Sequence, residues 1–281
     1  MIKITESPRD AMQALKTFIP TDKKKEYINE LFKVGFDMID VGSFVSSRAV
    51  PQMKDTAEVL EGIKDKFSSK VSVLVGNERY AEDAAKYDIV DYLNYPFSIS
   101  DIFQKKNMNA NLDKSIRTVE KILNICEKNK KKPNITIAVA FGNPYDEDWG
   151  IDILMDWVEV LYNMGLRYIP LADTTASGSP HLIGLVFDNV IREFPDVEFN
   201  FHLHTKSKDT ISKIEAAYNS GCRNFDTVFN SMGGCPMSGK ELVANLNTLD
   251  FVNWLDQKNI NHNIKKSFFD NAIKKALDIF S

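Results

Sequence analysis

The sequence has few cysteines, and this scarcity excludes one class of protein. Its 281 residues include three cysteines, which form neither an even disulfide framework nor a Cys-x-x-Cys pair. A disulfide-stapled secreted domain is therefore excluded, and a reducing compartment is expected. Cys126 in "ILNIC" and Cys222 in "NSGCRNF" are expected to be small buried side chains, whereas Cys235 follows two glycines in a loop.

The sequence also lacks a large excess of either charge and any long apolar run. The formal net charge is −4, and the lysines are scattered or form short runs such as "CEKNKKKPN", so no nucleic-acid surface is expected. No apolar run approaches the roughly 20 residues of a membrane span, and "MIKITESPRD" lacks the pattern of a signal peptide. We therefore expect a cytoplasmic protein without nucleic-acid or membrane partners.

Eight short runs rich in β-branched and aromatic residues predict strands. They cover residues 2–7, 37–44, 71–77, 90–98, 135–142, 168–175, 199–205 and 225–231. Segments with helical spacing lie between them, for instance 22–35, 113–129, 151–165 and 209–221. This alternation predicts an α/β fold. Eight strands favour a (β/α)8 TIM barrel, although an open doubly wound sheet gives a similar pattern; no Gly-x-Gly-x-x-Gly follows the first strand. We expect one catalytic domain, 1–281, with the barrel over about 1–247 and additional C-terminal helices over about 248–281.

Two of the four histidines lie one residue apart in "EFNFHLHTKS", residues 198–207. Apolar and polar residues alternate there with the two-residue period of a strand, so His202 and His204 point to the same face. Two imidazoles in this arrangement can bind one metal ion, while two polar side chains on a wet strand face remain the alternative. His181 is different, because Ser179 and Pro180 predict a helix start that places it in the first turn.

Active sites of such barrels lie at the carboxyl ends of the strands, and polar residues gather at the predicted ends. These residues are Glu6, Arg9, Asp10, Asp40, Ser43, Asn77, Ser98, Asn143, Asp173, Thr174, His202, His204 and Asn230. Burying such a set is costly unless an ion and a polar ligand satisfy it. These polar residues, which we call the polar ring, therefore predict a site for an ion and a polar ligand at the carboxyl ends of the strands.

Adjacent opposite charges follow the first predicted strand in "ESPRDAMQ". A surface ion pair is the simplest interpretation of Arg9 and Asp10. Together with the two histidines, however, Asp10 supplies the anionic oxygen that completes a site for a divalent cation. The guanidinium of Arg9 then lies where it can bind an anionic substrate or a developing oxyanion.

The segment "SMGGCPMSGKELVANLNT", residues 231–248, predicts a loop over the eighth strand. Glycine hinges allow such a loop to close over a site and exclude water. Cys235 in this loop is a candidate acid or nucleophile. Asn245 is a candidate neutral fourth metal ligand, although an ordinary loop or helix-cap asparagine would explain it too.

The motifs "ITESPRDAMQ", "IDVGSFVSSRAVPQM", "LADTT", "HLH" and "GGCPM", in this order, resemble those of the 3-hydroxy-3-methylglutaryl-CoA lyases. These enzymes belong to a metal-dependent barrel family of lyases and Claisen-type synthases. The likeness runs over nearly the whole chain. Its most specific parts are "SFVS…VPQM" and the "GGCP" loop, because the wider family shares only the Arg-Asp and His-x-His elements.

The resemblance implies cleavage of a 3-hydroxy-3-methylglutaryl thioester, an acyl-CoA substrate, to acetyl-CoA and acetoacetate, with Mg²⁺ or Mn²⁺ as the cofactor. The implied metal ligands are Asp10, His202, His204 and Asn245. The catalytic residues are expected to be Arg9, Asp10, Asp173, His202 and Cys235. Substrate contacts are expected from Arg9, Gln13, Asp40, Ser43 and Asn77.

Two other functions remain open on the sequence alone. A related Claisen-type synthase or lyase acting on another hydroxyacyl-CoA or a 2-hydroxy acid would use the same Arg9, Asp10, His202 and His204. A non-catalytic protein that keeps the barrel would be the second alternative, and the retention of the polar set argues against it. The added terminal helices favour a homodimer.

Overall fold

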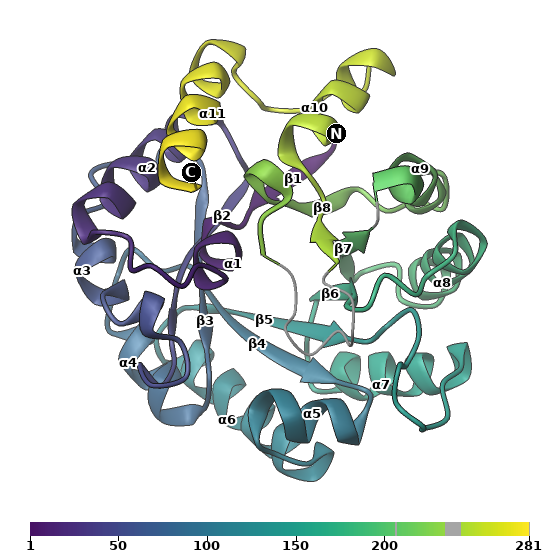
Figure 1. The fold of residues 1–281 in the computed structure, drawn as a ribbon. Coiled ribbons are helices and arrows are strands. Elements are labelled where there is room, and N and C mark those ends of the chain that lie inside the picture. Colours follow the sequence, from purple (N-terminus) through teal and green to yellow (C-terminus); the bar gives the residue numbers. More distant parts are fainter. Residues whose placement is uncertain (206, 234–242, 281) are drawn as a thin grey trace.

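The computed structural model describes residues 1–205, 207–233 and 243–280. Parallel strands stand side by side around a closed barrel (Figure 1). They are β1 (Lys3–Glu6), β2 (Met38–Phe44), β3 (Lys70–Val75), β4 (Tyr92–Ser98), β5 (Lys132–Ala138), β6 (Tyr168–Asp173), β7 (Glu198–Thr205) and β8 (Asn224–Thr227). β1 pairs with both β2 and β8, and pairing of β6 with β7 completes the ring. The predicted TIM barrel is confirmed.

Helices surround the barrel and connect its strands (Figure 1). They are α1 (Pro8–Gln13), α2 (Thr21–Val34), α3 (Thr56–Glu61), α4 (Glu78–Ala85), α5 (Asp101–Met108), α6 (Leu112–Lys128), α7 (Ile151–Asn163), α8 (Pro180–Glu193) and α9 (Thr210–Asn219). Ser179 caps α8 by accepting a hydrogen bond from the backbone N–H of Leu182, so His181 lies in the first turn as predicted. Within the described ranges, no helix has both the length and the apolarity needed to cross a bilayer.

Two helices follow the barrel, as predicted for the C-terminal segment. They are α10 (Thr248–Gln257) and α11 (Lys266–Phe280). α11 lies beside α2 (Figure 1), where the rings of Tyr27 and Phe280 meet edge to face with centroids 5.7 Å apart. The ring of Phe269 packs on Phe229, at the end of β8, with centroids 5.4 Å apart. The added helices therefore bury aromatic surface where the last strand meets the first.

Alternation along β7 separates the packed face of the strand from the face that carries the histidines. Phe201 is fully buried, and its ring lies 5.2 Å from the rings of both Phe141 and Phe187, the latter on α8. On the other face, Asn200 donates a hydrogen bond to Asp226 of β8 at 2.6 Å. This alternation directs His202 and His204 into the barrel, as the two-residue period predicted.

Two strands end earlier than predicted, so the predicted C-terminal ends of the fifth and eighth strands were wrong. β5 ends at Ala138, short of the predicted residue 142, because Val139 has a left-handed backbone with φ of 55°. β8 ends at Thr227, short of residue 231, because a turn follows in which Asn230 has φ of 61°. Positive φ values break the extended conformation that strand pairing requires.

Two cysteine predictions are confirmed. Cys126 and Cys222 are both buried free thiols. Burial raises the pKa of each thiol to about 12. Neither group is therefore a reactive thiolate at neutral pH.

Candidate active site and metal centre

Arg9 and Asp10 lie in α1, directly after β1, at the mouth of the barrel. Both are buried, at 6 % exposure. The guanidinium of Arg9 donates to one oxygen of Asp40, from Nε at 3.0 Å and from Nη2 at 2.6 Å, and from Nη1 to Asp10 at 3.0 Å. Gln13, one turn further along α1, donates from Nε2 to the same oxygen of Asp10 at 2.7 Å. These bonds fix the orientation of the Asp10 carboxylate.

The two imidazoles of β7 are held by hydrogen bonds through their Nδ1 atoms. Nδ1 of His204 lies 2.8 Å from the carbonyl oxygen of Thr174, and Nδ1 of His202 lies 3.0 Å from Asp226 Oδ2. The carbonyl oxygen can only accept, so Nδ1 of His204 carries the proton. The two Nε2 atoms therefore face each other, 3.1 Å apart.

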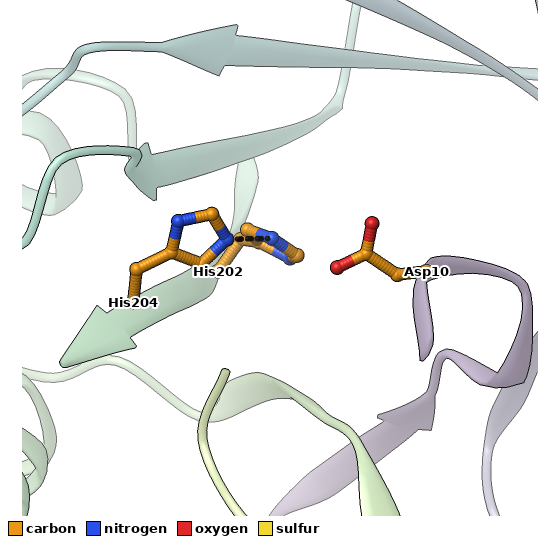
Figure 2. Close-up of side chains that lie close together, drawn as sticks. All are labelled: Asp10, His202 and His204. Carbon is orange, nitrogen blue, oxygen red and sulfur yellow. Dashed lines mark hydrogen bonds between the residues drawn. The ribbon is translucent and has the colours of Figure 1, made fainter. Parts of the chain in front are cut away.

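Asp10, His202 and His204 together offer the donor set of a metal site. Figure 2 shows the two imidazoles side by side on β7, with the carboxylate of Asp10 facing them from the helix after β1. One ligand atom of each residue lies within 4.8 Å of the other two. Ligands bound at about 2.1 Å can be up to about 4 Å apart, so the 3.1 Å between the imidazoles suits a shared ion. The residues present thus fit a divalent cation.

Asn245 also reaches this centre. It lies in β9 (Ala244–Asn245), which pairs antiparallel with β7 and places Asn245 opposite His204. Its Nδ2 donates to Asp10 Oδ2 at 2.7 Å and to the carbonyl oxygen of Met232 at 2.8 Å. Gly233 packs against Asp10 and Asn245, and its backbone has a φ of 86°. A Cβ at this position would lie 2.6 Å from the carbonyl oxygen of Asp10. Only glycine allows this close approach.

The local charges keep two of the three candidate ligands in the protonation state that a metal needs. Burial raises the pKa of Asp10, but the charge of Arg9 and then those of the two imidazoles outweigh burial, so the pKa is lowered overall. Burial, and then the charge of His202, lower the pKa of His204 to about 4. Asp10 is therefore a carboxylate and His204 a neutral imidazole at neutral pH.

His202 behaves differently. Burial alone would lower its pKa, but the hydrogen bond and the charge of Asp226, followed by the charge of Asp10, raise it overall. Its two ring nitrogens contact different partners, Nδ1 facing Asp226 and Nε2 facing His204. The raised pKa favours the protonated form of this ring, which makes His202 a candidate proton carrier.

A cavity of about 660 Å³ opens beside these residues at the mouth of the barrel. Seven predicted site residues line it, and these are Arg9, Asp10, Gln13, Asp40, Asn77, His202 and His204. The volume is in the range of small-molecule sites. The structure thus brings together most of the residues that the sequence singled out, from four different strands or the segments that follow them.

Six residues of the predicted polar ring do not line this cavity, and these are Glu6, Ser43, Ser98, Asn143, Asp173 and Asn230. Asp173 does not line the cavity, although its neighbours Ala172 and Thr174 do; it binds Lys213 of α9. Ser43 lines a neighbouring cavity with Thr56 and Tyr80. Glu6 is fully buried and accepts hydrogen bonds from Thr227, Phe229 and Thr248. Cys235 lies outside the described residues.

Asp226 is a functional candidate that the sequence reasoning missed. It lines the cavity from β8 and accepts hydrogen bonds from Asn200 and His202. The sequence did contain an indication of its role, because Asp226 is an acidic residue inside the predicted strand 225–231, in "NFDTVF". A charge at such a position is costly unless it is partnered.

The chain matches a protein-family model described as HMGL-like over residues 2–272. Among curated proteins it is similar to the cytoplasmic 3-hydroxy-3-methylglutaryl-CoA lyase of Rattus norvegicus. The two are 31% identical over 261 residues, which cover 92% of this chain and 76% of the relative. The match therefore spans the barrel and is not confined to one motif.

Two solved structures have closely similar folds. One is an HMG-CoA lyase from Acinetobacter baumannii in complex with coenzyme A and 3-methylmalate, 28% identical, with a TM-score of 0.92 over 100% of this chain and 91% of that chain. The other is an HMG-CoA lyase from Brucella melitensis, 27% identical, with a TM-score of 0.90 over 99% of this chain and 98% of that chain. The likeness includes the helices after the barrel.

Proposed function

The chain belongs to the HMGL-like family, and from this premise we propose that it is a metal-dependent carbon–carbon lyase. Its proposed substrate is 3-hydroxy-3-methylglutaryl-CoA, which it cleaves to acetyl-CoA and acetoacetate. The observation that carries the proposal is the convergence of Asp10, His202 and His204 in one cavity, beside the guanidinium of Arg9. The names of the relatives supply the acyl-CoA substrate.

We assign the metal site to Asp10, His202 and His204, with Asn245 as the fourth ligand and Mg²⁺ or Mn²⁺ as the ion. Carboxylate and amide oxygens suit both of these ions. When bound, the ion supplies positive charge that lowers the pKa of the substrate hydroxyl and orients the substrate.

The reaction breaks the bond between C2 and C3 of the acyl chain. The C3 hydroxyl loses its proton and becomes the keto group of acetoacetate, while the electron pair of the broken bond passes to the thioester as an enolate. A proton delivered to C2 then gives acetyl-CoA. The site must therefore accept a proton at an oxygen, stabilise an enolate oxygen and return a proton to carbon.

Among the cavity carboxylates Asp10, Asp40 and Asp226, we assign Asp40 to accept the hydroxyl proton. Burial raises its pKa, with Arg9 opposing, whereas the pKa of Asp10 is lowered. Within the described part of the chain, Oδ1 of Asp40 has no hydrogen-bond partner, and the residue lines the cavity. A carboxylate with a raised pKa is the stronger general base.

Arg9 is assigned to the enolate oxygen. A guanidinium has five N–H donors, and three of those of Arg9 bond to Asp10 and Asp40, which leaves two among the described contacts for a substrate oxygen. Both carboxylates hold the guanidinium in place before substrate binds, so it needs little reorganisation during the reaction.

The proton for C2 is assigned to Cys235 or, through a proton relay, to His202. The first assignment rests on the sequence, in which Cys235 stands in a glycine-rich loop next to the strand that carries Asp226. The raised pKa of His202 supports the second. We assign Gln13 and Asn77, which line the cavity, to substrate contacts, and keep Ser43 as a predicted contact.

The proposal also covers the cellular location and the oligomeric state of the protein. A cytoplasmic location is supported by the rat relative, whose name includes it. The barrel and its added helices are proposed to act as one catalytic domain in a homodimer, which sedimentation of the purified chain would test.

The deciding experiment incubates Mn²⁺-loaded protein with 3-hydroxy-3-methylglutaryl-CoA and measures acetoacetate and acetyl-CoA, with a chelator-treated sample as the control. We expect both products in equal amounts, and none after chelation. If folded, metal-loaded protein gives neither product, the proposed substrate is wrong. The same assay with other hydroxyacyl-CoA thioesters would then test the related lyases and synthases.

A further inference from the structure

A buried ion pair lies directly behind the metal centre, and the proposed reaction does not use it. Nζ of Lys213, from α9, lies 2.9 Å from Oδ2 of Asp173 at the end of β6. The two side chains are only 4% and 1% exposed. Removing a lysine from water is costly, and a buried ion pair is weak as a source of stability. A gain in stability therefore does not explain why this ion pair is buried next to the metal centre.

The pair fixes the turn that leads from β6 into α8. Nζ of Lys213 also donates to the carbonyl oxygen of Ala176 at 3.1 Å, while Oδ1 of Asp173 accepts from the backbone N–H of Gly178 at 3.1 Å. Ala176 has φ of 55°, in the left-handed region that a residue with a Cβ adopts at a cost. The contacts of Lys213 thus hold a strained turn in one conformation.

This turn carries Thr174, which contacts a candidate metal ligand. The hydroxyl of Thr174 accepts a hydrogen bond from the backbone N–H of Val139 at 2.9 Å, and its carbonyl oxygen accepts from Nδ1 of His204 at 2.8 Å. That second bond selects the tautomer of His204 with the lone pair on Nε2 and directs this atom toward His202. A shift of the turn would release the ring.

We propose that Lys213 is a positioning residue for the metal centre. Its ion pair with Asp173 holds residues 173–178 so that the Thr174 carbonyl fixes the tautomer and direction of the His204 ring. Among the described contacts, Lys213 bonds to Asp173 and Ala176, and neither of these residues lines the cavity. The inference rests on the metal site of the proposed function, but not on which thioester is cleaved.

The test measures Mn²⁺ binding and imidazole tautomers, neither of which requires turnover. In Lys213→Met, we expect the Mn²⁺ dissociation constant to rise by about tenfold or more, the range typical of lost partners of metal-bound histidines. The ¹H–¹⁵N two-bond spectrum of the histidines should also show His204 changing from the Nδ1–H tautomer to a mixture. The chain has four histidines, so the spectrum can be assigned.

A second buried lysine provides the matched control. Lys24 pairs with Asp55 at 2.7 Å, with side chains 2% and 9% exposed, and neither residue lines the central cavity. Lys24→Met removes a comparable ion pair, and we expect it to keep the wild-type Mn²⁺ dissociation constant and tautomer. A loss as large as that of Lys213→Met would show that any broken pair loosens the site, and would overturn the proposal.

Lys213→Met leaves a buried carboxylate without its cation, so this variant can fail to fold. The double variant Asp173→Asn/Lys213→Met removes both charges and is expected to show the same weakened Mn²⁺ binding. If either folded variant binds Mn²⁺ with the wild-type constant and keeps the Nδ1–H tautomer, the proposal is wrong. Tight Mn²⁺ binding by wild-type protein that cleaves no thioester would instead refute the proposed reaction alone.

Discussion

Nδ1 of His202 lies 3.0 Å from Oδ2 of Asp226, and this contact turns Nε2 of the same ring toward His204 and Asp10. Asp226 is held in turn by Nδ2 of Asn200, at 2.6 Å from its other oxygen. The carboxylate therefore has a fixed position behind the imidazole. Such a partner orients a metal-bound histidine and increases its basicity.

The first prediction concerns this carboxylate. Asp226→Asn removes the charge behind His202 while keeping the shape of the side chain, and we expect Mn²⁺ binding to weaken by roughly 10–100-fold. Isothermal titration calorimetry measures the change directly. Asp152→Asn, on the exposed surface of α7, is the control and should leave the Mn²⁺ affinity unaltered. An unchanged Mn²⁺ affinity in Asp226→Asn would show that Asp226 does not support metal binding.

Arg9→Gln tests the assignment of the guanidinium to the enolate. Loss of one preorganised donor typically lowers kcat by about 10²–10³, and we expect a fall in this range. Because Arg9 is not a metal ligand, Mn²⁺ affinity should change by far less. Arg9→Lys keeps the charge but loses the planar fork, so its kcat should lie between those of wild type and Arg9→Gln. Near-normal turnover of Arg9→Gln would refute the role.

Cys235→Ala tests the proton donor that was predicted from the sequence. We expect a folded protein that binds Mn²⁺ normally and loses most of its turnover, because the proton for C2 has lost its source. Cys126→Ala is the matched control, since Cys126 is a buried thiol of α6 whose pKa burial raises to about 12. Retention of full activity in Cys235→Ala would leave His202 as the proton donor.

Much of the barrel and the centre of the site could be predicted because they depend on local patterns. The alternation of residues 199–204 fixes which side chains of β7 share a face, and a residue following a parallel strand must lie at the barrel mouth. These two rules were sufficient to bring His202, His204 and Asp10 together. Asn245 was a candidate fourth ligand from its place in the chain, the resemblance to a known family implied the same role, and the structure places it opposite His204.

The parts of the site that the sequence does not place depend on long-range contacts. Asp173 and Thr174 end the same strand, but adjacent strand residues face opposite ways, and of the two only Thr174 lines the cavity. The catalytic role of Asp173 stays a prediction. Lys213 carries no local signal beyond its place on the buried side of α9 with Ile214 and Ala217. That α9 directs this lysine at the end of β6 follows from tertiary packing, which a single sequence does not display.

The last prediction uses the pH dependence of stability. Glu6 is fully buried, and burial raises its pKa from 4.5 to about 8 despite the hydrogen bonds from Thr248, Phe229 and Thr227. Between these two values the folded state holds a proton that the unfolded state has lost. The free energy of unfolding contributed by Glu6 therefore falls as the pH rises through this window.

Glu6→Gln keeps a neutral side chain of the same length and removes this titration. We expect the melting temperature of the wild type to fall between about pH 5 and about pH 8, and that of Glu6→Gln to fall less over the same range. Scanning calorimetry of both proteins at each pH measures the difference. Glu61→Gln, exposed at the end of α3, is the control and should follow the wild type. If Glu6→Gln shows the full wild-type dependence, the carboxyl group of Glu6 is not what titrates in the folded protein.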